Sequence, residues 1–113
     1  MAKLEDYRFG RVVIDGDAET RDVIVLPGRV VRSWWRQEGH RLVREDLNEV
    51  LEELPERLLI GTGAYGRMEP DAGLLDELRG RGITVEVMPT GEAVRRYAEL
   101  DPRRTAVALH LTC

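Results

Sequence analysis

Apolar residues in the first third of the chain come in short runs, and turn residues separate these runs. The runs cover residues 7–10, 12–14, 22–26 and 29–31. They are rich in β-branched side chains, which is typical of strands, and Asp-Gly and Pro-Gly pairs lie between them. The connections are too short for crossover helices, so we expect these strands to pair as antiparallel neighbours.

Beyond residue 45 the pattern alternates between the helical and the strand period. Leu47, Val50, Leu51 and Leu54 follow the spacing i, i+3, i+4, i+7, which predicts a helix over residues 46–54 that Pro55 ends. Further helices are expected over 70–79, with Pro70 in the first turn, and from 90, with Thr90 as the N-cap. Strands are expected over 57–60, 83–88 and 106–111.

These elements predict a mixed α/β fold. N-terminal antiparallel strands are followed by a β-α-β-α-β unit, and the helices pack on the sheet core. Right-handed crossovers make the three strands of that unit parallel. A chain of 113 residues suits one domain over residues 1–113.

Charge and cysteine content narrow the classes of partner. Seventeen basic against 21 acidic residues leave a net charge of −4, so we expect no nucleic-acid partner. Cys113 is the one cysteine, which excludes an internal disulfide or a cysteine-based zinc site and favours a reducing compartment. No apolar leader and no run of about 18 apolar residues is present, so we expect a cytoplasmic protein that does not enter a membrane.

A glycine-rich loop follows the strand expected at 57–60, and a second glycine turn precedes the last helix. The candidate ligand-binding residues are Gly61, Thr62, Gly63, Tyr65, Gly66, Arg67, Thr90 and Gly91. Glycines let backbone N–H groups approach an anion, and a helix N-terminus adds positive potential. The loop matches neither the P-loop nor a good dinucleotide fingerprint. The alternative, and the commoner cause of such a loop, is tight backbone geometry with positive φ.

Arginines crowd around the only two tryptophans, in a segment that we call the Arg/Trp segment (residues 29–44). Its candidate partner-binding residues are Arg32, Trp34, Trp35, Arg36 and His40. Arginine beside tryptophan suits recognition of a protein partner or an anion, through forked hydrogen bonds and stacking. The alternative is that one tryptophan fills the core while arginine stems cover apolar surface. The sequence does not say which tryptophan is buried.

Catalytic chemistry has little support among the residues. His40 and His110 are the only histidines and lack metal-spaced partners, so we expect no metal and no cofactor. His110 alternates out of the apolar face of the last strand, which favours a structural role. Ser33, the only serine, lies outside a nucleophile elbow. We predict no catalytic residue, and His40, near Glu38 and Glu45, is the one candidate base.

Several segments together resemble a known family. They are Phe9-Gly10, residues 22–25, Trp34-Trp35, and Gly61-Thr62-Gly63 with residues 81–90. In their order and spacing, from Tyr7 to Leu111, they resemble a small conserved domain of uncharacterised chemistry. Its eukaryotic members include a mitochondrial complex I assembly factor and an adipogenesis-associated cytosolic protein. The resemblance implies a mixed α/β fold, and it supplies no established reaction and no catalytic residues to carry over to this chain.

Two hypotheses from different classes follow. The first is a non-catalytic binding or assembly module that presents the Arg/Trp segment and the glycine-loop edge to a protein partner or a small anion. The alternative is a small enzyme that acts on an anionic metabolite at the glycine-loop edge, where Tyr65, Arg67 and Thr90 bind the substrate and His40 carries a proton. Both hypotheses need the two glycine turns to emerge side by side. The oligomeric state is not predicted.

Overall fold

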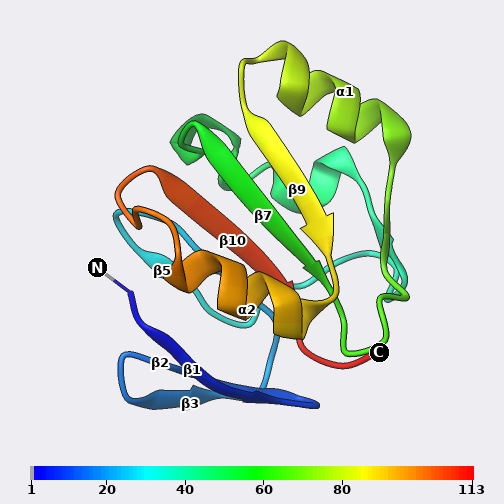
Figure 1. The fold of residues 1–113 in the computed structure, drawn as a ribbon. Helices are drawn as coiled ribbons and strands as arrows, with labels where there is room; N and C mark the ends of the chain where they lie inside the picture. The colour runs from blue at the N-terminus through cyan, green and yellow to red at the C-terminus, as the bar shows by residue number, and fades with distance from the viewer. Residues whose placement is uncertain (1) are drawn as a thin grey trace.

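Residues 2–113 are described by a computed structural model, in which a central sheet lies between two layers (Figure 1). The strands are β1 (Leu4–Arg8), β2 (Arg11–Ile14), β3 (Asp17–Glu19), β4 (Val23–Val25), β5 (Val30–Val31), β6 (Arg41–Leu42), β7 (Arg57–Thr62), β8 (Glu69–Pro70), β9 (Thr84–Met88) and β10 (Thr105–His110). The helices are α1 (Ala72–Gly80) and α2 (Thr90–Ala98), with two 3-10 helices, η1 (Arg44–Leu47) and η2 (Leu51–Glu53). The predicted mixed α/β fold is confirmed.

The central sheet has the strand order β5-β4-β10-β7-β9. β7 pairs in parallel with β9 on one side and with β10 on the other, as the crossover argument predicts. The arrowheads of these three strands point to the same edge, close to the C-terminus (Figure 1). β4 runs antiparallel to β10, and β5 antiparallel to β4, so the sheet is mixed. The N-terminal strands form a separate antiparallel sheet, β1-β2-β3, and β6 pairs with β8.

The strands of the central sheet are buried on both faces, because alternate side chains point to opposite sides. One face packs against α1 and the 3-10 helices, through Ile24, Leu58, Ile60, Ala106, Ala108, Leu74, Leu78, Leu47 and Val50. The other packs against α2 and β2, through Val23, Val25, Leu59, Val107, Leu109, Ala93, Tyr97, Val12 and Ile14. The two apolar sets explain why β10 is buried along its whole length.

The helix expected over residues 46–54 is not formed, and the two short 3-10 helices take its place. In an α-helix the carbonyl of Asp46 would accept from the N–H of Val50. Here that carbonyl accepts the indole N–H of Trp34 at 2.9 Å. The N–H of Val50 donates instead to the carbonyl of Leu47 at 2.9 Å. The apolar spacing correctly predicted which side chains pack in the core. The backbone conformation differs from the prediction because a tertiary hydrogen bond occupies the carbonyl of Asp46.

Both α-helices begin differently from the expectation. α1 starts at Ala72 with Asp71 as its N-cap, whose carboxylate accepts the N–H of Leu74 at 3.1 Å. Pro70 lies before the helix, in β8. Thr90 is the first residue of α2 and does not cap it. Its hydroxyl is engaged by other strands, as described below.

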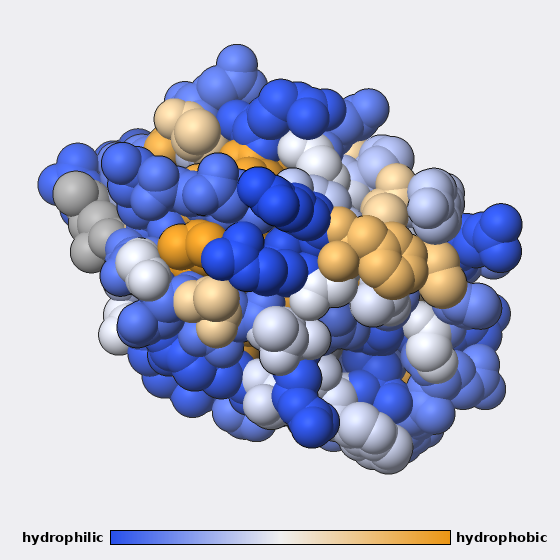
Figure 2. Space-filling view, turned by 90° about the horizontal axis from the view of Figure 1, so that it is seen from below, coloured by the Kyte–Doolittle hydropathy of each residue, from blue (hydrophilic) through white to orange (hydrophobic). Residues whose placement is uncertain are grey.

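The face formed by β1, β2 and β3 is largely hydrophilic, and only small, separate hydrophobic patches interrupt it (Figure 2). Across residues 2–113, the helices are too short and too polar to span a bilayer.

Candidate functional site

The two glycine turns lie side by side at the carboxyl edge of the central sheet. The carbonyl of Gly63 accepts the N–H of Thr90 at 3.0 Å, and the N–H of Gly63 donates to the Thr90 hydroxyl at 2.8 Å. That hydroxyl donates in turn to the carbonyl of His110 at 2.6 Å. One buried threonine therefore joins the ends of β7, β9 and β10, at the edge where open α/β sheets commonly bind ligands.

Two backbone N–H groups in and beside the glycine loop are engaged by the C-terminal residues. The N–H of Ala64 donates to the carbonyl of Thr112 at 2.6 Å, and the N–H of Arg67 donates to that of Cys113 at 3.2 Å. Gly63 has a φ of +106°, and a Cβ there would lie 2.6 Å from the Cys113 oxygen. The glycine is thus explained by close backbone approach, and these N–H groups are not free for an anion.

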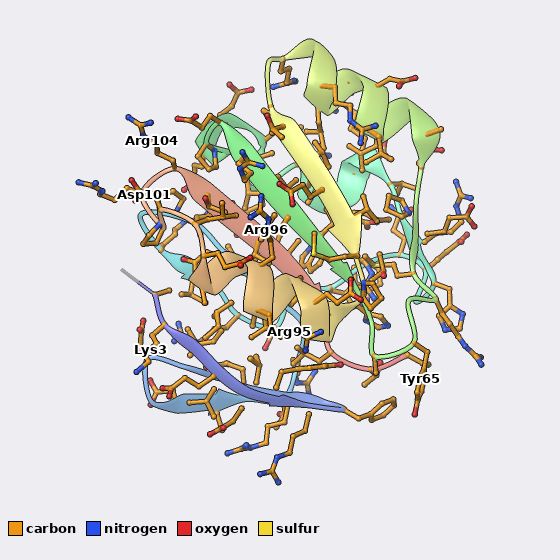
Figure 3. All side chains as sticks on the ribbon, in the orientation of Figure 1. Lys3, Tyr65, Arg95, Arg96, Asp101 and Arg104 are labelled. Carbon is orange, nitrogen blue, oxygen red and sulfur yellow. The ribbon has the colours of Figure 1, made fainter. Side chains whose placement is uncertain are left out.

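Four of the eight candidate ligand-binding residues have side chains, and these side chains differ in their environments. Thr62 and Thr90 are buried, and the Thr62 hydroxyl donates to the carbonyl of Met88 at 3.1 Å. Tyr65 is 70% exposed, packs beside Phe9 with ring centroids 6.0 Å apart, and points away from the ribbon (Figure 3). Gly66 and Arg67 are also exposed. The exposed members form an outer surface rather than a pocket wall.

A polar cluster of Asp22, Arg36 and His110, the last two buried, lies at the same sheet edge. Asp22 precedes β4, and its carboxylate accepts from Arg36 and from the N–H of Leu111 at 2.8 Å. His110 Nδ1 lies 2.9 Å from both the Asp22 carboxylate and the Arg36 guanidinium. Arg36 also donates to the carbonyl of Gly39 at 3.1 Å. The cluster ties the Arg/Trp segment to the ends of β4 and β10.

Asp22 stays ionised because its partners outweigh its burial. Burial by itself raises the pKa of the Asp22 carboxyl group, since it disfavours the charged form. Hydrogen bonds from His110, the Leu111 N–H and Arg36 oppose this effect and hold that pKa below its ordinary value. The cluster is therefore a charged anchor for the segment.

The two tryptophans have opposite environments. Trp34 is 8% exposed, donates its indole N–H to Asp46, and lies 5.0 Å from the guanidinium carbon of Arg36. Trp35 is 75% exposed. The buried Trp34 and Arg36 flank it in the sequence, and Ser33 before them has a φ of +54°. The buried side chains of Trp34 and Arg36 thus hold the backbone in place on both sides of the exposed Trp35 indole.

Trp35 borders an open groove of about 460 Å³, which we call the Trp35 groove. Residues 31–35 and 37 line one side, and Glu45, Asp46, Asn48 and Glu49 line the other. The groove lies between the Arg/Trp segment and η1, with the residues just after it. It combines an exposed aromatic face with carboxylates.

The arginines of the Arg/Trp segment do not form a free positive surface, because acidic side chains pair with them. The pairs are Arg29–Glu53 at 2.7 Å, Arg32–Glu19 at 2.8 Å, Arg36–Asp22, Arg41–Asp71 at 3.2 Å and Arg44–Glu77 at 2.8 Å. His40 is exposed, and its Nε2 lies 3.7 Å from the Sγ of Cys113. Among residues 2–113, no group of three or more His, Cys, Asp and Glu side chains is placed to hold a metal ion.

Sequence reasoning found Arg36 but missed its two partners. In the sequence, Asp22 is the polar residue that starts a run of β-branched residues. His110 is the one polar residue within the apolar strand expected over residues 106–111. Their positions could have indicated the cluster, because each residue lies at the end of a strand, on the sheet edge where the glycine turns emerge. The pairing itself depends on β4 lying against β10, which no local pattern specifies.

Solved structures resemble this chain over nearly its whole length. The conserved hypothetical protein PH1505 from Pyrococcus horikoshii OT3 is 31% identical with a TM-score of 0.83, over 98% of this chain and 99% of that chain. XCC1710 from Xanthomonas campestris is 25% identical with a TM-score of 0.83, over 98% and 85%. A Bordetella pertussis protein described as an Mth938-like domain is 22% identical with a TM-score of 0.70, over 97% and 85%, and shows the fold alone.

The family match is equally extensive. A family model described as a protein of unknown function (DUF498/DUF598) matches residues 4–111. It spans all three sheets, both α-helices and the polar cluster at the sheet edge. This chain therefore belongs to the DUF498/DUF598 family of proteins of unknown function.

Proposed function

We propose that this chain is a non-catalytic binding module that presents Trp35 and the Trp35 groove to a protein partner. The observation that carries the proposal is the 75% exposure of Trp35 between two buried anchors, Trp34 and Arg36. Tryptophan is enriched among the residues that contribute most to protein–protein binding. A backbone held in place before binding loses less conformational entropy when the partner docks.

The role that we propose is of the assembly type and is carried out in the cytoplasm. The resemblance to a family with an assembly-factor member supports the first part, and the single cysteine supports the second. The alternative, an enzyme at the glycine-loop edge, has less support because the N–H groups of Gly63, Ala64, Gly66 and Arg67 already have acceptors within the protein. We therefore place the binding surface at the Trp35 groove.

Site-specific photo-crosslinking in the native host tests the proposal. A benzophenone amino acid replaces Gln37, which is exposed and lines the groove, while Trp35 stays in place. The control carries the same group at Arg104, which is outside the groove. We expect a discrete crosslinked protein from position 37 and not from position 104.

The partner found in this way is then purified and titrated against variants. Trp35→Ala should weaken its binding at least tenfold, while Tyr65→Ala, which removes an equally exposed aromatic ring, should leave it unchanged. Equal crosslinking from both positions, or equal affinity of the two variants, would overturn the proposal.

A further inference from the structure

We propose that the partner segment that enters the Trp35 groove carries a basic side chain, arginine or lysine, which stacks on Trp35 and pairs with Glu45 and Glu49. This inference rests on the proposed function and names the chemistry of its partner. It follows from the charges that line the groove, from which of them are already paired, and from a matching arrangement inside the protein.

Acidic groups dominate the lining of the groove. Glu45, Asp46 and Glu49 contribute three carboxylates, and Arg32 is the one basic residue that lines the groove. Arg32 is paired with Glu19 at 2.8 Å, outside the groove. The lining therefore favours a cation over an anion, although the sequence around it is rich in arginine.

Two of the three carboxylates remain available to an incoming cation. Asp46 is engaged, because its oxygens accept the N–H groups of Gln37 at 3.2 Å and Val43 at 2.9 Å. Glu49 meets Arg29 only at 3.5 Å, since that guanidinium binds Glu53 more closely.

Glu45 is exposed and has no basic side chain within 4.0 Å among residues 2–113. Arg44, its neighbour in the sequence, turns to Glu77 at 2.8 Å and does not neutralise it. Glu45 and Glu49 are therefore the two groups that we expect to meet the cation.

The protein already contains this type of recognition in its interior. Arg36 lies over the ring of Trp34 at 5.0 Å and pairs with the carboxylate of Asp22. Stacking on an indole and a charged hydrogen bond to a carboxylate together suit a basic side chain. Trp35 and the groove carboxylates offer the same two kinds of contact to a side chain from outside.

Short capped peptides test the inference directly. The probes are acetylated and amidated Gly-Gly-X-Gly-Gly peptides in which X is arginine, lysine or glutamate. Binding is read from the indole N–H signals of the ¹⁵N-labelled protein. The chain has two indoles, and the signal that is lost in the Trp35→Ala variant is the one assigned to Trp35.

We expect the arginine and lysine peptides to shift the Trp35 signal with millimolar affinity, and the glutamate peptide to have no effect. Added salt should weaken the shift, because exposed charges are screened. In the double variant Glu45→Gln/Glu49→Gln the affinity should fall at least threefold. The double variant Glu38→Gln/Glu99→Gln removes the same charge from outside the groove and should behave like the parent protein.

Equal shifts with the arginine and glutamate peptides, or equal affinity of the two double variants, would overturn the inference. The same result would leave the proposed function intact if the crosslinked partner still depends on Trp35. If the crosslinked partner binds the Trp35→Ala variant as well as the parent protein, the proposed function itself is wrong. The two failures are therefore distinguishable.

Discussion

The glycine-loop edge and the Trp35 groove are both unusual in sequence, yet they use their polar groups in opposite ways. At the edge, Thr112 and Cys113 accept the N–H groups of Ala64 and Arg67, and the Thr90 hydroxyl joins three strands. In the groove, an exposed indole lies beside carboxylates that are only partly paired. The composition of a loop indicates an unusual backbone conformation. Whether the polar groups of that loop can bind a ligand depends on hydrogen-bond partners that lie far away in the sequence.

The strongest test of this contrast is Gly63→Ala. Alanine at a φ of +106° is strained, and its Cβ would meet the Cys113 oxygen at 2.6 Å. We expect the free energy of unfolding to fall by about 4 kcal/mol, as the combined cost of strain and overpacking. Urea denaturation followed by circular dichroism measures it.

Gly80→Ala is the matched control for that measurement. Gly80 ends α1, has no positive φ and would place its Cβ in open space. We expect a change within about 1 kcal/mol, in the stabilising direction, because alanine is the better helix former. If both variants unfold at the same urea concentration, close packing does not explain the glycine loop.

The next largest effect is expected for Arg36→Leu. This substitution leaves the largely buried carboxylate of Asp22 with His110 as its one side-chain partner. Breaking a buried charged pair should lower the free energy of unfolding by about 3 kcal/mol. Arg41→Leu breaks an exposed pair with Asp71 and should cost under about 1 kcal/mol. Similar costs for the two variants would contradict the anchoring role of the cluster.

Much of the fold was predictable because its information is local. The β7-α1-β9-α2-β10 order follows from apolar periods and from proline and glycine stops, and the crossover rule then makes the strands parallel. The helix over residues 46–54 failed because Trp34 takes the carbonyl of Asp46. A contact between residues twelve positions apart cannot be seen in a helical stripe.

The candidate site was predictable only in part, for a similar reason. The side-by-side turns follow from parallel neighbours, and residues 61–66 and 89–91 do meet through Gly63 and Thr90. The arginines were visible, but their acidic partners are distant in sequence: Arg36 lies 14 residues from Asp22 and 74 from His110. Whether a charge is free depends on such pairs.

Acid should weaken the anchor of the Trp35 groove in a defined direction. The pKa of Asp22 is lowered in the folded protein by His110, the Leu111 N–H and Arg36, against the effect of burial. Its contribution to stability is therefore full above the unfolded value of about 4 and is lost as the pH falls through the folded pKa.

The measurement is the free energy of unfolding between pH 5 and pH 2.5. Asp22→Asn should flatten this acid limb by at most about 1.4 kcal/mol per pH unit, the limit for one proton. Glu77→Gln alters a partly exposed carboxylate paired with Arg44 and Arg81, and it should flatten the limb less because solvent screens these pairs more than the Asp22 cluster. A variant limb as steep as that of the parent protein would show that Asp22 does not titrate as described.

The smallest effect on stability is expected for Trp35→Ala. Because this side chain is 75% exposed, its removal should change the free energy of unfolding by no more than about 0.5 kcal/mol. Trp34→Ala, one position away, removes a buried ring and should cost about 3–5 kcal/mol. If Trp35→Ala proves as costly as Trp34→Ala, the indole supports the fold and is not held out for a partner. A stable Trp35→Ala protein that no longer binds the crosslinked partner separates the two roles, because a purely structural tryptophan cannot lose binding without losing stability.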